Sequence, residues 1–373
     1  MPCAPNKPLP LDTSVRELFR PLAPYLDIPG VTEIAVNRPG EVFVEAGPHW
    51  TRFEAPELTL ERCWSMATAI ASYANQRVDS MAPLLGAQLP GLQRIQIAVP
   101  PAVEEHTVAM TIRIPDAQVR SFDEYEAQGF FSRFMWPQPS KLGNRSQDLD
   151  QVQLRLINCL QAGALADFLR IAVRHKLNIA FVGDTGSGKT SLMKAACQYI
   201  PAEERLITIE DVRELFLPKH ANRVHMLYSR PTQGMASVSP ADLIATNMRM
   251  KPDRVLLAEL RGGEAFDFLK LLTTGHSGSL TSFHAESCAL AVERYILMCK
   301  EHSQAAIYDA EALRRLVGLT IDVIVHIKVD LQYAEDGQPL RKERYVAEVS
   351  YDPVAKLNHR FGAASLLHTR GLP

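Results

Sequence analysis

A glycine-rich stretch followed by a lysine and a threonine is the part of this sequence best suited to chemistry. Residues 177–190 read LNIAFVGDTGSGKT and contain the pattern G-x-x-x-x-G-K-[ST], which runs from Gly183 to Thr190. Because glycine has no Cβ, such a loop turns tightly and aims backbone N–H groups at an anion, to which the start of the next helix adds partial positive charge. The stretch is therefore predicted to bind a nucleotide polyphosphate.

Each residue type in this loop has a chemical task. Lys189 is expected to reach the β- and γ-phosphates, and the hydroxyl of Thr190 to complete the shell of a Mg²⁺ ion that keeps waters and phosphate oxygens. The predicted ligands are ATP and Mg²⁺. An ordinary strand-to-helix turn is the alternative, but the apolar run before the loop and the helix-forming run 191–199 favour nucleotide binding. The residues expected to hold the nucleotide are Gly183, Asp184, Thr185, Gly186, Ser187, Gly188, Lys189, Thr190 and Ser191.

Hydrolysis needs an oriented water, and two later acids follow predicted strands. Residues 207–211 place Glu210 at the carboxyl end of one strand, and residues 254–259 are an apolar run that ends in Glu259, a Walker B pattern. A lone acid there usually caps a helix or lies on the surface. Two such acids after a phosphate loop favour an active site, in which Glu259 orders the attacking water directly or through Mg²⁺ and Glu210 assists.

A histidine is predicted at the end of a third strand. Period-2 alternation in residues 279–284 places Leu280, Ser282 and His284 on one face. His284 could donate a hydrogen bond to the γ-phosphate. A lone histidine is more often structural, and only its neighbours make this one a candidate.

The elements that must position these residues alternate between strands and helices. Strands are predicted at 205–209, 254–258 and 279–283, and helices at 241–250, 264–274 and 289–300. One or two helices are expected within 152–176, and two final strands at 323–329 and 345–351. This alternation predicts an α/β domain with a mostly parallel sheet covered by helices on both faces.

A smaller α+β domain is predicted before it. Its elements are a short helix within 11–26, a hairpin of strands 31–36 and 41–45, a helix at 59–75, and strands at 94–99 and 108–114. The predicted division is an N-terminal domain at 1–115, a linker at 116–150, a P-loop ATPase domain at 151–352 and a poorly ordered tail at 353–373.

The predicted linker contains four aromatic residues, Phe130, Phe131, Phe134 and Trp136. They form either an adhesive patch on a functional loop or part of the core of one domain. Composition leaves both interpretations open.

Charge and cysteine content give few indications of partner or compartment. The 373 residues include 40 basic and 42 acidic ones, so the net charge of −2 does not indicate nucleic acid or an anionic membrane as a partner.

The six cysteines are scattered, which favours reduced thiols over disulfides or a zinc site. Without a signal peptide or a run of about 20 apolar residues, we expect a cytoplasmic protein.

Four stretches in this order resemble the secretion traffic ATPase superfamily, and most closely its type IV secretion and conjugation branch. They are 183–190 as Walker A, 207–212 as an aspartate box, 249–266 as Walker B and 275–285 as a histidine box. Upstream stretches agree as well, and the resemblance covers about residues 15 to 330. The ordered set is far more specific than Walker A alone.

The resemblance implies a RecA-like ATPase that forms a hexameric ring and converts hydrolysis into motion between its two domains. Its partners would be cytoplasmic or inner-membrane components of a secretion machine, with nucleic acid involved only indirectly. Its place would be cytoplasmic and peripheral to the inner membrane.

Residue roles follow from the resemblance by position. Lys189 and Thr190 would bind phosphate and Mg²⁺, Glu259 would be the catalytic carboxylate and contact the metal, Glu210 would support it, and His284 would sense the γ-phosphate.

Several arginines also match the family. Arg113 would close over the phosphates as a clamp, whereas the individual roles of Arg249, Arg254 and Arg261 stay open. One departure is Ala258, where the family usually has glycine. It is expected to tighten the backbone near the metal without abolishing the chemistry.

Three alternatives stay open on sequence alone. The first is a type II secretion or type IV pilus motor; many such assembly motors carry paired C-x-x-C elements, absent here, although retraction motors lack them too. The second is a nucleic-acid translocase, and the third a nucleotide-dependent switch that hydrolyses slowly.

Overall fold

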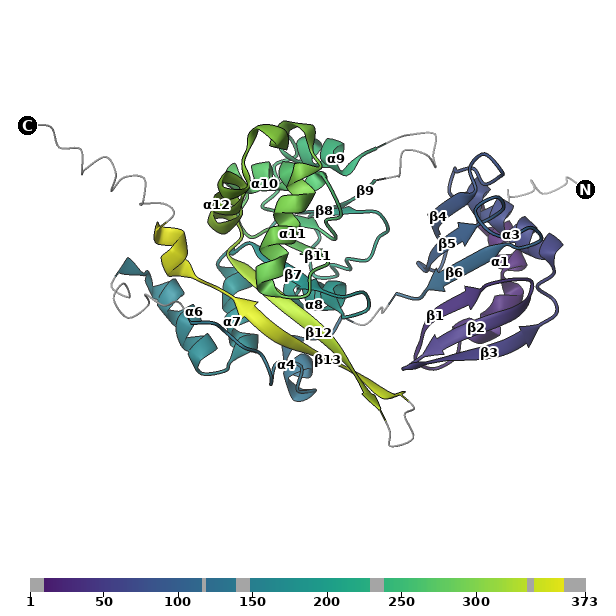
Figure 1. Ribbon diagram of the computed structural model, residues 1–373, viewed down its shortest axis with the longest axis horizontal. Coiled ribbons are helices and arrows are strands. Elements are labelled where there is room, and N and C mark those ends of the chain that lie inside the picture. Colours follow the sequence, from purple (N-terminus) through teal and green to yellow (C-terminus); the bar gives the residue numbers. More distant parts are fainter. Residues whose placement is uncertain (1–9, 116–118, 139–147, 229–237, 334–338, 359–373) are drawn as a thin grey trace, which may run out of the picture. The chain divides into compact units, whose positions relative to one another are not determined.

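The structure is a computed structural model that describes residues 10–115, 119–138, 148–228, 238–333 and 339–358. The chain divides into two compact units, each built around its own sheet (Figure 1). The first unit comprises Met1–Ala117, Ser229–Ser239 and Leu331–Lys342, and the second comprises Gln118–Tyr228, Pro240–Asp330 and Glu343–Pro373.

One antiparallel sheet and several short helices make up the first unit. The strand order is β3-β2-β1-β6-β5-β4, and every neighbouring pair is antiparallel. The strands are β1 (Val31–Val36), β2 (Gly40–Ala46), β3 (His49–Ala55), β4 (Leu84–Gln88), β5 (Arg94–Ala98) and β6 (Ala109–Arg113). The helices are α1 (Thr13–Leu18), η1 (Arg20–Leu22), α2 (Ala23–Leu26) and α3 (Leu60–Tyr73).

Helix α3 covers the core of this unit. It begins after Thr59, whose side chain accepts a hydrogen bond from the backbone N–H of Arg62 at 3.2 Å and so satisfies one donor of the first turn. Its buried side chains recur at helical spacing, which places them on one face. They are Cys63, Met66, Ala67, Ile70 and Ala71.

Two features of the first unit differ from the prediction. The helix expected within 11–26 is broken into α1, η1 and α2, because Pro21 and Pro24 have no backbone N–H and lie at the starts of new segments. Strands β3 and β4 were not predicted. Most side chains of β3 are exposed, and β4 contains Gly86, so neither shows a clear alternation of apolar and polar residues.

The second unit contains a seven-stranded sheet in the order β13-β12-β7-β11-β10-β8-β9. Each neighbouring pair from β12 to β9 is parallel, which confirms the predicted, mostly parallel α/β domain. The strands are β7 (Ile179–Gly183), β8 (Leu206–Glu210), β9 (Arg223–Leu227), β10 (Arg254–Leu257), β11 (Leu280–Phe283), β12 (Val323–Tyr333) and β13 (Pro339–Ser350). The last residues of β12 and the first of β13 are those grouped with the first unit.

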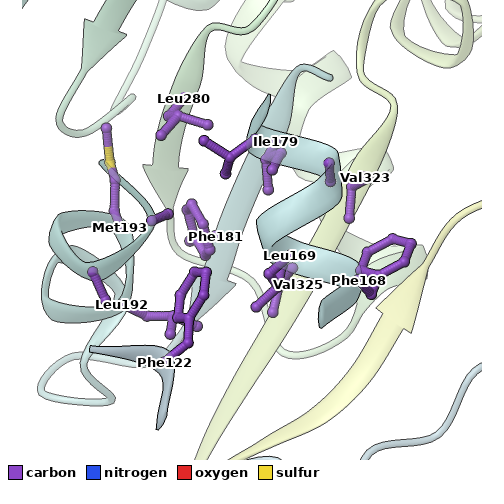
Figure 2. Packing of buried hydrophobic residues seen from close by; sticks show 14 of the residues in the cluster. Phe122, Phe168, Leu169, Ile179, Phe181, Leu192, Met193, Leu280, Val323 and Val325 are labelled. Carbon is purple, nitrogen blue, oxygen red and sulfur yellow. The ribbon is translucent and has the colours of Figure 1, made fainter. Parts of the chain in front are cut away.

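Helices on this sheet enclose a large apolar core. They are α4 (Phe122–Ala127), α6 (Gln151–Gln161), α7 (Leu165–Arg174), α8 (Lys189–Cys197), α9 (Pro240–Asn247), α10 (Glu264–Thr273), α11 (Cys288–Lys300), η3 (Ser303–Ile307) and α12 (Ala310–Thr320). Figure 2 shows side chains from α7, α8, β7 and β12 converging in that core. Each such side chain stabilises the unit by roughly 1.5–3 kcal/mol through its burial.

Residues 119–138, predicted as part of a linker, pack within the second unit. Phe122 stacks on Tyr199 with ring centroids 4.6 Å apart, and Phe130 and Phe131 are buried in the same core. The carbonyl of Phe130 accepts a hydrogen bond from the N–H of Val346 at 2.8 Å. These aromatic residues therefore fill a core, which is the interpretation that composition left open.

The last described residues of the chain belong to the second unit. Val354 is buried in the core of the second unit, and the rest of the predicted tail from 359 onward lies outside the described residues.

The described cysteines are free thiols, namely Cys63, Cys159, Cys197, Cys288 and Cys299. Across the described ranges, no helix combines the length and apolarity needed to cross a bilayer.

Candidate functional site

The phosphate loop runs from the buried strand β7 to the start of α8 at Lys189. Gly183 has a φ of +149°, and a Cβ placed on it would lie 2.1 Å from the carbonyl oxygen of Ile327 in β12. Gly186 and Gly188 have φ values of +73° and +98°, a left-handed region that costs other residues about 1–2 kcal/mol. The path of the loop therefore depends on its glycines.

The ammonium group of Lys189 is buried beneath this loop. Nζ donates hydrogen bonds to the carbonyl oxygens of Gly183 at 2.8 Å and Asp184 at 2.7 Å. It also lies 3.4 Å from Nδ1 of His284. The structure thus places the positive charge of the loop directly beside the predicted histidine.

The other loop residues differ in their exposure. Ser187 is fully buried, and its hydroxyl has no hydrogen-bond partner in the described part of the chain. Thr190 and Ser191 lie half-buried in the first turn of α8, where their backbone N–H groups belong to the helix start. The loop residues exposed to solvent are Asp184, Thr185 and Gly186.

Glu259 and His284 meet at the carboxyl ends of neighbouring strands β10 and β11. Oε1 of Glu259 lies 3.2 Å from Nε2 of His284, so the imidazole stands between this carboxylate and Lys189. Burial, and then the charge of Lys189, lower the pKa of His284, although Glu259 opposes this. A lowered pKa keeps the ring neutral at pH 7, with one nitrogen as donor and the other as acceptor.

Arg261 extends this network to a second carboxylate. Its Nε and Nη2 donate to Oε2 of Glu259 at 2.9 and 2.5 Å, and Nη1 lies 3.1 Å from Oδ2 of Asp211. Burial opposes the charge of Arg261, but Asp211 and Glu259 more than offset this and raise its pKa. Arg261, whose role the sequence left open, therefore holds the carboxylate of Glu259 in place.

Glu210 has a different environment. It ends β8 and is buried, and its Oε2 accepts hydrogen bonds from the backbone N–H groups of Glu214 at 2.7 Å and Leu215 at 2.8 Å. Its Oε1 accepts a hydrogen bond from Thr208 at 2.7 Å and lies 3.3 Å from Nδ1 of His225. In this conformation Glu210 fixes the segment after β8, and its support of catalysis stays a prediction.

Arg254 lies at the other end of β10, away from Glu259. It is fully buried, donates to both carboxylate oxygens of Glu204 at 2.6 and 3.1 Å, and donates to the carbonyl oxygen of Val173 at 2.6 Å. These bonds tie β10 to α7 and to the segment before β8. Arg249, just beyond α9, is exposed.

Two further predicted residues have distinct positions. Arg113 is the last residue of β6 in the first unit and is exposed, so its closure over the phosphates stays a prediction. The methyl group of Ala258 packs into the core of the second unit, while its carbonyl oxygen accepts a hydrogen bond from Ser282 at 2.6 Å. An alanine therefore fits at this point of the sheet.

Sequence reasoning missed one residue that contacts the loop. Nε of Arg344 in β13 donates a hydrogen bond to the carbonyl oxygen of Gly186 at 2.8 Å. The two residues are 158 positions apart. No local motif around Arg344 could have revealed this contact.

The oxygen donors at the loop fit a magnesium ion. Within the described residues, no group of three or more His, Cys, Asp or Glu side chains could hold a metal by itself. Mg²⁺ commonly takes only one or two protein oxygens and completes its shell with waters and substrate phosphates. The hydroxyl of Thr190 is one hard oxygen donor of that kind, and the carboxylate of Glu259, which lies 3.2 Å from Nε2 of His284, is a second.

Comparison with known proteins extends over both units. Residues 17–325 match the family described as Type II/IV secretion system protein. The chain is 44% identical over 345 residues to the type IV secretion system protein VirB11 of Brucella suis, which covers 92% of this chain and 91% of that protein. It is 41% identical over 355 residues to the type IV secretion system protein PtlH of Bordetella pertussis, covering 90% of this chain and 98% of that one.

A solved structure gives the same result. The crystal structure of the VirB11 ATPase from the Brucella suis type IV secretion system, in complex with sulphate, matches with a TM-score of 0.51 and 43% identity. The match covers 94% of this chain and 98% of that chain.

Proposed function

The chain belongs to the type II/IV secretion system protein family, and on that premise we propose that it hydrolyses ATP to ADP and phosphate as the ATPase of a type IV secretion system. Two observations support this. Relatives named as type IV secretion proteins match 90% or more of the chain at 41–44% identity. The single observation that carries the chemistry is the contact series from Lys189 through His284 to Glu259 at the phosphate loop.

Each residue of the candidate site has its own role in the proposed hydrolysis. Lys189, now bound to two backbone carbonyl oxygens, exchanges these for phosphate oxygens when ATP binds. Thr190 and Glu259 would hold Mg²⁺, which when bound neutralises charge on the phosphates. Glu259 orders the attacking water. The single N–H of neutral His284, which faces Glu259 in this structure, would turn toward the γ-phosphate when ATP binds.

The assembly and its location are further parts of the proposal. We infer a homo-hexameric ring, peripheral to the inner membrane on its cytoplasmic side, that acts with other components of the secretion machine. Arg113 of the first unit would close over the phosphates, so that hydrolysis moves the two units of each subunit. The names of the relatives favour a type IV secretion system over a type II secretion or pilus motor.

The direct test is steady-state ATP hydrolysis of the purified protein and of Glu259→Gln. Removing the carboxylate charge that orders the water is expected to lower kcat by about 100-fold or more, while ATP still binds. Glu293→Gln, which neutralises an exposed carboxylate on α11, is the matched control and should leave the rate unchanged.

Two additions to the assay test the type of motor. Hydrolysis is measured with phospholipid vesicles and with single-stranded DNA, and the mass in solution is measured with a slowly hydrolysed ATP analogue. Hexamers whose activity ignores DNA support the secretion ATPase. Strong stimulation by DNA would instead indicate a translocase, and a persistent monomer with slow turnover would indicate a switch.

A further inference from the structure

Strand β13 brings a basic side chain to the phosphate loop from a part of the chain outside all four motifs. Nε of Arg344 donates to the carbonyl oxygen of Gly186 at 2.8 Å. Its Cδ would lie 3.8 Å from a Cβ built on Gly188, so the side chain crosses the loop between these two glycines. Arg344 is itself exposed, which leaves its guanidinium open to a ligand.

The direction of this side chain is set by its two neighbours. Glu343 forms an ion pair with Arg133, and the hydroxyl of Tyr345 donates to Asp330 at 2.7 Å. The guanidinium of Arg133 also lies over the ring of Tyr345, 4.4 Å from its centroid. Because successive side chains of a strand point to opposite faces, holding the two neighbours on one face directs Arg344 to the other.

The backbone of β13 is equally well anchored. Besides its place beside β12, it accepts and donates hydrogen bonds with the segment that follows α4. The N–H of Val346 donates to Phe130 at 2.8 Å, the N–H of Met135 donates to Ala347 at 2.9 Å, and the N–H of Val349 donates to Met135 at 2.9 Å. Arg344 is therefore presented to the loop by a strand paired on both sides.

The chemistry of this position is that of an anion site. A guanidinium has five N–H donors in a planar fork that matches phosphate oxygens, and among contacts within the described residues only Nε is occupied, by Gly186. Phosphate loops direct backbone N–H groups inward at the polyphosphate, and a fixed positive charge beside them strengthens binding in proportion to the negative charge of the ligand.

We propose that Arg344 binds the polyphosphate of the nucleotide from within the same subunit, using its two terminal amino groups while Nε holds Gly186. This rests on the proposed ATPase function and adds a phosphate-binding residue to it. The competing explanation is that Arg344 only braces the loop, in which case it would not distinguish ligands by their phosphates.

The test compares ligands with and without phosphates on the full-length protein. Affinities for inorganic tripolyphosphate, ADP and adenosine are measured by calorimetry for the wild type, Arg344→Gln and Arg344→Lys. Arg344→Gln is expected to weaken the binding of tripolyphosphate and ADP at least about tenfold, the loss typical of even one of the charge-assisted hydrogen bonds that the two amino groups would make. Adenosine binding should not change, and Arg344→Lys should recover part of the loss because it keeps the charge.

Controls separate the possible failures. Arg314→Gln removes an exposed arginine of α12 and should bind every ligand like the wild type. In steady-state hydrolysis, Arg344→Gln should raise KM with little change in kcat. Equal affinity of Arg344→Gln and wild type for tripolyphosphate would overturn this proposal alone, as would equal weakening of adenosine and ADP. A wild type that binds no ADP would overturn the proposed function as well.

Discussion

Two arginine–glutamate pairs lie at opposite ends of strand β10. At the amino end, the side chains of Arg254 and Glu204 are 0% and 12% exposed, and beyond the carboxyl end those of Arg261 and Glu259 are 35% and 24% exposed. The first pair also contacts the carbonyl oxygen of Val173 and the ammonium group of Lys176. The second pair continues through His284 to Lys189 of the phosphate loop. The same chemical pair is thus largely buried at one end of the strand, whereas at the other it is partly exposed and connected to the candidate site.

Burial gives these two arginine–glutamate pairs different roles, one in stability and one in ligand binding. An ion pair sealed from water loses much solvation on folding, so breaking it leaves a costly unpaired charge. An ion pair near the surface contributes little to stability, but its members can exchange partners when a charged ligand arrives. The two pairs should therefore separate cleanly in measurements of stability and of activity.

The largest expected effect is on stability, at the buried pair. Arg254→Ala leaves the carboxylate of Glu204 with only its longer ion pair to the partly exposed Lys176, at 3.7 Å. We expect the free energy of unfolding to fall by about 3–5 kcal/mol in urea denaturation. Arg314→Ala breaks an exposed pair with Glu293 and should cost under about 1 kcal/mol. If Arg254→Ala does not fold, replacing both partners with Arg254→Met and Glu204→Leu should restore solubility. Equal stability of the two alanine variants would contradict this view of the buried pair.

The second effect is on activity, at the accessible pair. Arg261→Gln removes the charge and donors that hold Oε2 of Glu259, so we expect kcat for ATP hydrolysis to fall by about 10–100-fold. The free energy of unfolding should change by less than about 1 kcal/mol. The same two assays on Arg254→Ala should show the reverse pattern. An unchanged kcat in Arg261→Gln would remove Arg261 from the site.

The smallest effect concerns pH and reports on His284. Burial and Lys189 lower its pKa from the ordinary value of 6.5, so below about pH 6.5 the unfolded chain binds more protons than the folded one. The stability contributed by neutral His284 is therefore complete above this pH and is lost as the pH falls further. We expect the melting temperature and the hydrolysis rate of the wild type to drop more steeply between pH 7 and pH 5.5 than those of His284→Gln. Parallel pH profiles for the two proteins would contradict this assignment.

Much of the fold could be predicted because its determinants are local. The strands β7, β8, β10 and β11 are short apolar runs, and the loop after β7 is a motif of fixed spacing. Parallel strands carry their carboxyl ends to one edge of the sheet, so Lys189, Glu259 and His284 could be expected together. Their contacts in the structure agree with that expectation.

The missed features depend on contacts between distant parts of the chain. Arg344 meets Gly186 only because β13 folds back along β12, and no pattern near either residue encodes this. Oε2 of Glu210 accepts from backbone N–H groups of the segment after β8, whose path cannot be read from its composition. Strand β9 was likewise not predicted, since it is only half-buried and lies at the sheet edge. Helix α12 was also not predicted.

The close approach at Gly183 has a mechanical consequence. With the carbonyl oxygen of Ile327 where a side chain would begin, there is no room for even a methyl group between Gly183 and strand β12. Because the backbone of Gly183 already contacts that of Ile327, a displacement of the phosphate loop toward β12 would push on the strand directly. We therefore expect the start of the loop and strand β12 to move together, since Gly183 and Ile327 are also paired in the sheet.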